Sequence, residues 1–458
     1  MGLGYARGLF LSCPFCTLMP HAKISTFRAP RAWALGLLGA AALSTLPVQA
    51  QAPAAAAPAS AASQPAGPTV RPVFSVPMQA AQALLKDGKA QEAMAKLDEA
   101  AAVPDRTPFE NYVLARVRAS AAQSLGNRAL VVESLETAFA TGFVDKTEEA
   151  RLIEAVISLA WDLKDHARVI RWHERYVKAG GPNGSLQLLS IQSQAYAGDV
   201  AGAANALRER LDPAKDPSPP ETHLRLLLSY EQQLKDPGAA QTMERLAMAY
   251  PRPEYWSSVI FAAARSPSLD DRALLEMYRL LRLTGNLKLQ DLVEEMADLS
   301  MRVGLPGEAK AVLDEAQAGG VLSKPTPALQ KLRERVDKQA ASDRTERRAA
   351  EAAAPRAADG NALVNLGWAA LAEQPPNVAA ADAERAIGLL EQGIAKGGLR
   401  RGNEVRLHLG IAQLAAGRRD AARQTLTTLA EATKADPLAP AIQLWSRFVS
   451  APPLMPPR

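Results

Sequence analysis

The feature that most constrains the fold is an internal repeat of two helical segments joined by a tight turn. Each unit has an apolar helical stretch, a turn with Gly or Lys-Asp, and a second stretch with Ala and Leu at helical spacing. The turns fall in steps of 38, 38, 34, 37 and 69 residues, at Gly88, Gly126, Lys164, Gly198, Lys235 and Gly304. The last step spans two units, and a weaker unit at 261–281 fills it. The pattern predicts an all-α chain of stacked hairpins.

The repeat extends over most of the chain. The clear units lie at 80–104, 118–142, 155–180, 189–213, 224–251, 295–320 and 405–432. A further unit, 361–374 with 383–398, precedes the last one. One hairpin cannot bury its own apolar face, whereas eight or nine stacked hairpins can. The chain is also long for one compact core, so we expect an elongated array.

These units resemble the tetratricopeptide repeat, a helical hairpin of about 34 residues with small residues where its two helices approach. The first unit matches at Gly88, Ala93, Leu97 and Ala100, and the last at Leu409, Gly410, Gly417, Ala422 and Leu426. The unit before the last has Leu366 and Gly367, then an insertion around PPNV (375–378) before Ala386 and Leu390. The resemblance implies a right-handed superhelical α-solenoid whose first helices line a concave groove.

The chain begins with a segment typical of an export signal. Basic residues precede an apolar stretch at 32–46, and Ala50 and Ala52 offer small-residue cleavage sites. The apolar stretch has 15 residues, fewer than the roughly 18–20 needed to span a bilayer. We therefore expect a cleaved signal at 1–52, no transmembrane anchor in the mature chain, and a periplasmic location.

The two cysteines of the chain, Cys13 and Cys16, lie in a Cys-x-x-Cys sequence ahead of this signal. A redox pair normally lies at a helix N-terminus beside a strand, where the helix dipole lowers the thiol pKa, and neither neighbour is evident here. Met19 is a second possible start, which would make 1–18 an over-extended reading frame. With either start both cysteines leave with the signal, and we expect no thiol chemistry in the mature protein.

The charge balance argues against nucleic-acid binding. The formal net charge is +5, but residues 1–52 hold four bases and no acid, so the remainder carries about +1. A nucleic-acid footprint needs a basic surface on the folded part of the chain. Residues 53–72 are almost entirely Ala, Pro, Ser and Gln, which predicts a disordered tether. The chain ends in a Pro-rich tail at 448–458.

One segment interrupts the repeats. Residues 323–360 are dense in mixed charges and lack an apolar stripe after Val336. This composition is typical either of a solvated helical spacer or of a charged docking helix. We therefore divide the array into a solenoid at 73–322 and C-terminal repeats at 361–447.

No catalytic or metal-binding pattern is evident, and we predict a protein that is not an enzyme and holds no cofactor or metal. His166 and His173 lie seven residues apart beside Glu174, at positions where this repeat usually places packed aromatic residues. The sequence lacks His-Glu-x-x-His, zinc-ligand spacing, a phosphate-binding loop and a Gly-x-Ser-x-Gly elbow. An enzyme or small-ligand binder with an unrecognised pocket stays open as an alternative.

The expected working surface is the concave groove, which would hold an extended peptide or a partner helix. Candidate lining residues are polar or aromatic and lie on expected first helices or beside them: Gln192, Gln232, Tyr255, Trp256, Asn361, Asn365 and Trp368. Each of them also fits surface solvation or packing between repeats. Aromatic residues at interfaces supply contact area at low entropy cost, which favours Tyr255 and Trp256.

A closer resemblance concerns the order of three segments. YPRPEYW (250–256), the segment 296–322 and the segment 393–422 are similar to a group of exported proteobacterial repeat proteins. The shared residues are Tyr255, Trp256, Gly304, Leu305, Pro306, Ala309 and Gly320. Some members are encoded beside TonB and its inner-membrane partners. The resemblance implies a periplasmic adaptor for TonB-dependent transport, and assembly of the envelope or of a polysaccharide exporter is the alternative.

Overall fold

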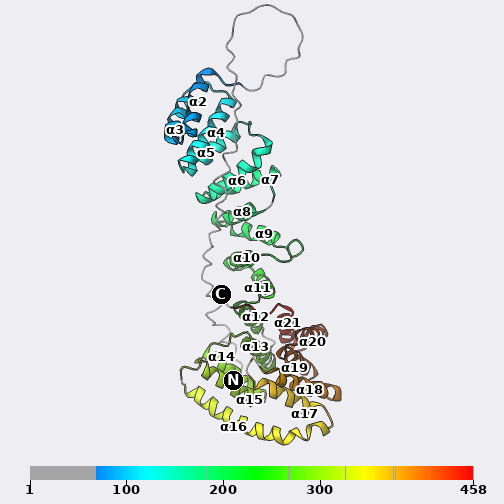
Figure 1. Ribbon diagram of the computed structural model, residues 1–458. Coiled ribbons are helices and arrows are strands. Elements are labelled where there is room, and N and C mark those ends of the chain that lie inside the picture. The colour runs from blue at the N-terminus through cyan, green and yellow to red at the C-terminus, as the bar shows by residue number, and fades with distance from the viewer. Residues whose placement is uncertain are drawn as a thin grey trace, which may run out of the picture. The chain divides into compact units, whose positions relative to one another are not determined.

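The structure is a computed structural model that describes residues 69–456, except 183, 267, 268, 325, 375 and 377. Every regular element in this part of the chain is helical, with twenty α-helices and one 3₁₀ helix, Ala354–Arg356 (Figure 1). The predicted all-α class is therefore confirmed. The predicted signal at 1–52, both cysteines and most of the predicted tether lie outside the described residues. None of the helices described has the length and apolar content to cross a membrane.

The chain divides into two compact units between Asp212 and Pro213. This boundary falls inside the segment 73–322 that the sequence treats as one solenoid, and not at the charged segment 323–360. The helices of the first unit pair as α2 (Pro72–Lys86) with α3 (Ala90–Ala101), α4 (Pro108–Ser124) with α5 (Arg128–Ala140), α6 (Lys146–Asp162) with α7 (His166–Lys178), and α8 (Ser185–Tyr196) with α9 (Val200–Arg210).

The turns inside the hairpins lie where the repeat places them. All seven turn residues of the repeat have positive φ, including Lys164 at 59° and Lys235 at 54°: Gly88, Gly126, Lys164, Gly198, Lys235, Gly304 and Gly417. In four turns the next residue is Asn or Asp, and in three of these its side chain caps the second helix. Asp165, for example, accepts a hydrogen bond from the backbone N–H of Arg168 at 3.0 Å. In these turns a residue with a left-handed backbone conformation thus ends the first helix, and an Asn or Asp side chain caps the start of the second.

The small residues of the repeat lie where two helices approach. A Cβ atom added to Gly410 would lie 2.5 Å from Cγ of Leu426, and one added to Gly367 would lie 2.9 Å from Cβ of Leu389. Both distances are shorter than real side chains allow. The predicted close approach at Gly367 and Gly410 is therefore confirmed, and a larger residue at either position would push the hairpin apart.

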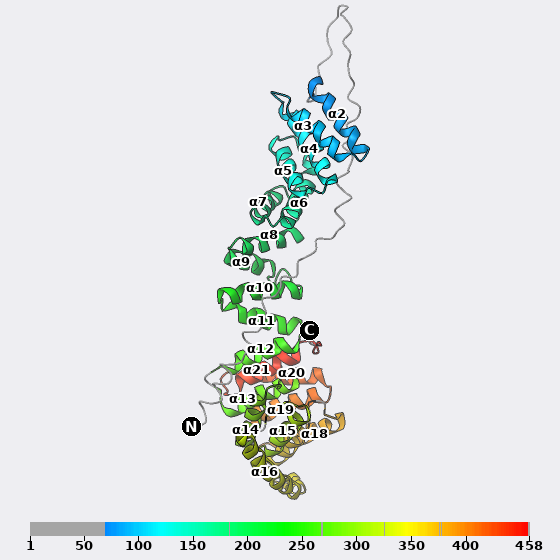
Figure 2. The same ribbon diagram turned by 90° about the vertical axis from the view of Figure 1, so that its left-hand side faces the viewer.

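The first unit, 69–212, is a stack in which each hairpin packs on its neighbours (Figure 2). Its largest core cluster joins α4 to α8 and includes Leu135, Ile153, Val156 and Trp172. First helices of adjacent hairpins also touch, because α2 contacts α4 and α6 contacts α8. Packing in this unit is therefore between sequence neighbours, as a repeat array requires.

The second unit, 213–456, contains the remaining helices. They are α10 (Glu221–Leu234), α11 (Gly238–Ala249), α12 (Pro253–Ala264), α13 (Asp271–Leu283), α14 (Gln290–Arg302), α15 (Pro306–Ala318), α16 (Pro327–Glu351), α17 (Asn361–Ala372), α18 (Ala380–Lys396), α19 (Gly402–Ala415), α20 (Arg419–Ala432) and α21 (Ala439–Ser450). The last helix returns to the start of this series, because α21 packs against α11, α12 and α13 (Figures 1 and 2). The second unit thus closes on itself.

Aromatic side chains of α21 and the C-terminal tail hold the end of the second unit against its first helices. Trp445 donates a hydrogen bond from its indole Nε1 to the backbone oxygen of Glu276 at 3.1 Å. Phe448 meets the ring of Trp256 edge-on at 5.1 Å. Farther on, the backbone N–H of Met455 donates to the oxygen of Pro251 at 2.8 Å. Helix α21 extends to Ser450, so the first residues of the predicted tail at 448–458 are helical.

The charged segment 323–360 forms the long helix α16, which packs on α14, α15 and α17. Thr326 caps it by accepting from the N–H of Leu329 at 3.0 Å. Its buried residues Leu329, Val336 and Ala340 follow at steps of seven and four, which is one face of a helix. Some of the charged residues on its other faces pair with neighbours, for example Arg335 with Asp298 at 2.6 Å.

Candidate ligand-binding site

Helix α13 supplies the charged residues around which the second unit closes. Arg272, Glu276 and Arg279 follow at steps of four and three, so they lie along one face of the helix. Asp270 begins this helix by accepting from the N–H of Ala273 at 2.8 Å. Glu276 and Arg279 are buried, which is rare for charged residues unless each has a partner.

The guanidinium of Arg279 is held by carboxylates on two helices. It donates from Nε to Oε1 of Glu308 at 2.8 Å and from Nη2 to Oε2 at 2.7 Å. Its Nη1 donates to Oε1 of Glu276. The Arg279 and Glu308 side chains are only 8% and 2% exposed. This two-pronged pair fixes α13 to α15 with the geometry that an Arg–carboxylate fork requires.

Helix α19 joins the same group of charges. Nε2 of His408 lies 2.8 Å from Oε1 of Glu276, and Arg272 pairs with Glu404 at 2.7 Å. The indole of Trp368 stacks on the His408 ring with centroids 3.5 Å apart and planes at 7°. The guanidinium carbon of Arg279 lies 4.7 Å from the centre of the Trp368 ring, which is a cation–π distance.

The neighbouring residues favour the ionised forms of Glu276 and Arg279 despite their burial. Burial opposes the charged form of Glu276, but Arg279 and His408 outweigh it and lower the pKa of that carboxyl. Burial likewise acts to lower the pKa of Arg279, but Glu276 and Glu308 outweigh it and raise that pKa. Each charge depends on the others, so removal of one partner leaves a buried charge uncompensated.

Part of this group could offer ligands to a cation. Glu276, Glu404 and His408 each present one ligand atom, and these atoms lie within 4.8 Å of one another. Two of the three carry guanidinium partners already, because Arg279 pairs with Glu276 and Arg272 with Glu404. A divalent cation would have to lie beside both positive charges. The donor set therefore fits an ion-pair network better than a metal site.

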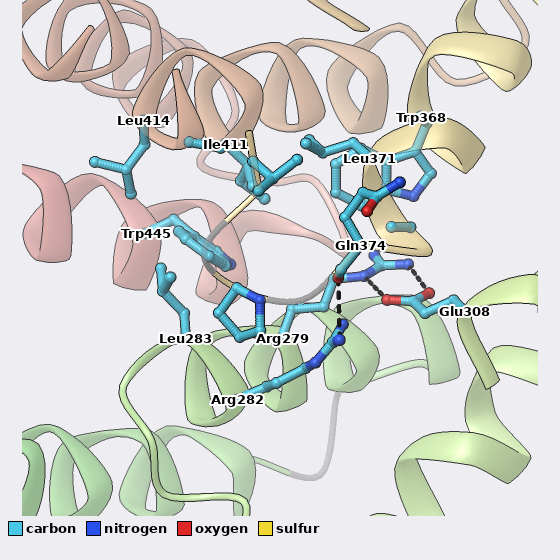
Figure 3. Close-up of a pocket in the computed structure, with 14 residues that line it drawn as sticks. Arg279, Arg282, Leu283, Glu308, Trp368, Leu371, Gln374, Ile411, Leu414 and Trp445 are labelled. Carbon is cyan, nitrogen blue, oxygen red and sulfur yellow. Dashed lines mark hydrogen bonds and ion pairs between the residues drawn. The ribbon is translucent and has the colours of Figure 1, made fainter. Parts of the chain in front are cut away.

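A cavity of about 410 Å³ opens beside this network (Figure 3). Its volume is within the range of about 300–1,000 Å³ that is usual for small-molecule sites. The walls come from α13, α15, α17, α19, α21 and the segment after α17. The lining residues are Arg279, Arg282, Leu283, Glu308, Trp368, Leu371, Ala372, Gln374, Pro376, Val378, Ile411, Leu414, Ala415 and Trp445. Most are apolar, and the charged ones gather on the α13 side.

Four of the residues predicted for the groove are buried. Tyr255 and Trp256 are each about 1% exposed, and Gln192 and Trp368 are also in the interior. Tyr255 donates from its hydroxyl to Oε1 of Glu221 at 2.6 Å. These positions agree with the packing interpretation that the sequence left open. Trp368 alone of the predicted residues lines the cavity.

The other predicted groove residues are at the surface or near it. Gln232 and Asn365 are exposed. Asn361 ties the start of α17 to the segment after α18, because its Nδ2 donates to the oxygen of Gly398 at 3.0 Å. Gln192 belongs to the first unit and the others to the second. Within the second unit the structure brings Trp368 into the cavity and leaves Gln232, Tyr255 and Trp256 outside its lining.

The two histidines that the sequence weighed as ligands pack against aromatic rings. His166 stacks on Tyr196 with centroids 4.7 Å apart, and the ring of His173 lies 6.5 Å from that of Tyr176. Burial lowers the pKa of both histidines.

Sequence reasoning missed His408, Glu276 and Arg279. A signal existed, because Glu276 and Arg279 are the charged residues of the otherwise apolar run 273–281, and a helix that is apolar all round is typically buried.

No protein-family model matches this chain, and a search among curated proteins found no similar sequence.

Proposed function

We propose that this protein is an exported, non-catalytic scaffold that binds a peptide segment or helix of a partner protein through its first unit. The observation that carries the proposal is a repeated exposed apolar position. Leu125, Leu163 and Tyr196 are 41%, 39% and 50% exposed, and each lies at the C-terminal end of a first helix. We infer that these side chains belong to one exposed apolar patch, which is the kind of surface that marks an interaction site.

Aromatic side chains surround one of these positions. Tyr196 stacks on His166 at 4.7 Å, and Trp161 lies 6.0 Å from Tyr196. His166 is further held by Ser193, whose Oγ lies 3.3 Å from its Nδ1. Tyr196 is therefore restrained on one face while half of it stays exposed. A restrained aromatic ring binds an apolar residue of a partner with little loss of entropy.

The location and the partner class rest on the sequence. The expected signal at 1–52 favours the periplasm, and the resemblance to exported repeat proteins makes the TonB system the first partner to test. A partner from envelope or polysaccharide-export assembly is the alternative. N-terminal sequencing of the protein from the periplasmic fraction tests the location, and a mature chain beginning after Ala50 or Ala52 is the expected result.

Site-directed photo-crosslinking in the native host tests the surface. A photo-reactive phenylalanine replaces Tyr196 in one variant and Val177 in the other. Val177 is the matched control, because it is apolar and 44% exposed but lies on a second helix, α7. We expect a discrete protein adduct from position 196 and none from position 177. No adduct from either position, or the same adducts from both, would contradict the proposed surface.

A further inference from the structure

We propose that the cavity of the second unit is a binding site for a small monocarboxylate with an apolar body. The site is separate from the protein-binding surface proposed for the first unit, and neither depends on the other. The apolar walls of the cavity, its unpaired donors and the guanidinium of Arg282 define this ligand.

The apolar part of the lining defines the body of the ligand. Leu283, Leu371, Ile411, Leu414 and Trp445 come from four helices and surround the space in Figure 3. Burial of an aliphatic chain against such a surface is favourable by about 25 cal/mol for each Å² removed from water. These five residues offer no free polar group, and the polar side chains of the lining, Arg279, Arg282, Glu308 and Gln374, lie close together in Figure 3. The ligand therefore has one polar end.

Two donors of the lining have no acceptor in the described part of the chain. Both oxygens of Glu308 accept bonds from Arg279, at 2.8 and 2.7 Å. Arg282 donates from Nε and Nη2, but its Nη1 donates to no group in the described part of the chain. The indole Nε1 of Trp368 is buried and has no partner there either. A buried donor without an acceptor is unfavourable, so an acceptor on a ligand would be stabilised here.

A carboxylate is the acceptor that best fits the donor of Arg282. Two arginines and one glutamate are the ionisable residues of the described lining, and Arg279 is already held by Glu276 and Glu308, so Arg282 is the arginine with a donor left for a ligand. Arg282 already pairs with Glu315, but that carboxylate is 44% exposed, so solvent weakens its hold on the guanidinium. A guanidinium binds a carboxylate more strongly than a neutral acceptor. The cavity thus combines an apolar interior with a cationic donor at one end.

Calorimetric titration of the full-length protein with octanoate tests the proposal, with octanol as the neutral probe of the same chain length. We expect saturable binding of one octanoate, weaker binding of octanol, and a loss of about tenfold or more in octanoate affinity for Arg282→Gln. Arg335→Gln is the matched control, because Arg335 on α16 is paired with Asp298 on α14 and does not line the cavity. It should leave the affinity unchanged.

Two further measurements separate binding in the cavity from other effects. Ala415→Phe fills the cavity without touching a charge, and it should abolish octanoate binding while the circular dichroism spectrum stays that of the parent. A hexapeptide ending in leucine tests a second source of a carboxylate, the C-terminus of a peptide chain. The proposal is overturned if octanoate does not saturate, if octanol binds equally well, if Arg335→Gln weakens binding as much as Arg282→Gln, or if the peptide binds more tightly than octanoate.

Discussion

The two units are built from the same kind of hairpin but are held together differently. In the first unit, side-chain bonds such as Arg71–Glu110 and Trp172–Glu136 join residues 39 and 36 positions apart, which is about one repeat. In the second unit, Arg272 bonds Glu404 across 132 positions and Trp445 bonds Glu276 across 169. A stack depends on its nearest neighbours, whereas a closed unit depends on contacts that only the complete fold provides.

The difference extends to the placement of charge. In the first unit the pair Arg168–Glu136 is 23% and 25% exposed, so water shares in its stabilisation. In the second unit the pair Arg279–Glu308 is almost fully buried. A buried pair adds little net stability but makes loss of one partner costly. A single substitution at a buried pair should therefore destabilise the second unit more than the matched substitution destabilises the first. The loss should also extend over the whole second unit.

The largest expected effect comes from removing the aromatic residue at the closure. Trp445→Ala deletes a side chain that is about 1% exposed and breaks its bond to Glu276. We expect the free energy of unfolding of the second unit to fall by about 3–5 kcal/mol. Denaturant unfolding of the variant measures this loss.

Trp172→Ala is the matched change in the first unit, where Trp172 is also buried. Its effect should be confined to hairpins next to α7. If Trp445→Ala also affected only the helices next to it in sequence, the contrast between a closed unit and a stack would be wrong.

Removal of the buried guanidinium should have the next largest effect. Arg279→Met leaves the carboxylates of Glu276 and Glu308 without their main partner, and we expect a loss of about 3 kcal/mol. Arg168→Met, which breaks a partly exposed pair in the first unit, should cost about 1 kcal/mol or less. Thermal unfolding of both variants compares the two losses of stability. Equal losses would show that burial does not distinguish the two ion pairs.

The first unit should lose stability in acid through Glu110. Its hydrogen bond with Arg71, together with backbone bonds from Arg71 and Thr107, lowers the pKa of Glu110 from its ordinary value of 4.5 to about 2. A depressed pKa stabilises the fold above the unfolded pKa, and that stability is lost as the pH falls from about 4.5 to 2.

Glu110→Gln keeps the polar contact to Thr107 but removes the charge. It should cost about 1–2 kcal/mol at pH 7, after allowance for screening at the partly exposed Arg71, and almost nothing at pH 2. Unfolding free energies of the parent and the variant, measured from pH 7 to pH 2, test whether the cost of the substitution falls with pH. A loss that did not change with pH would assign the role of Glu110 to helix capping alone.

The second unit should show the opposite pH response at Glu295, with the smallest expected effect. Burial raises the pKa of Glu295 to about 7, although Tyr278 donates to it at 2.7 Å. A raised pKa stabilises the fold fully below the unfolded value of about 4.5, and that stability is lost as the pH rises to about 7. Glu295→Gln should therefore stabilise the second unit by about 1 kcal/mol at pH 8 and leave it unchanged at pH 4. Unfolding free energies of the parent and the variant at pH 4 and pH 8 measure this effect. A variant that is less stable than the parent at pH 8 would contradict the prediction.

The local part of the fold was predictable from sequence, and the closure was not. A Gly or Lys-Asp turn every 34–38 residues predicts Lys164 and Gly198 as helix ends, and both have positive φ. The small residues Gly367 and Gly410 predict where helices approach, and both face a leucine. Each of these signals involves residues of a single repeat, so each can be recognised from a short stretch of sequence.

The buried network and the cavity beside it depend on residues that no single repeat identifies. Glu276, His408 and Trp445 lie on three separate helices, α13, α19 and α21, and nothing in their local sequence indicates that they meet. Trp368 was predicted as a groove residue because it is aromatic and lies on a first helix. In the structure its ring packs against His408 of α19 and Arg279 of α13, at the wall of the cavity. Such a placement follows from closure of the second unit, which the repeat pattern does not encode.

Hydrogen exchange, followed peptide by peptide in the parent protein and in Trp445→Ala, tests the closure most directly. If α21 closes the second unit, the substitution should speed exchange in α13 as well as in α21, because Trp445 bonds the backbone of α13. Exchange in α2 to α9 should stay as in the parent protein. Faster exchange confined to α21 and its sequence neighbour α20 would contradict the account, because α13 would then hold its structure without the closing helix.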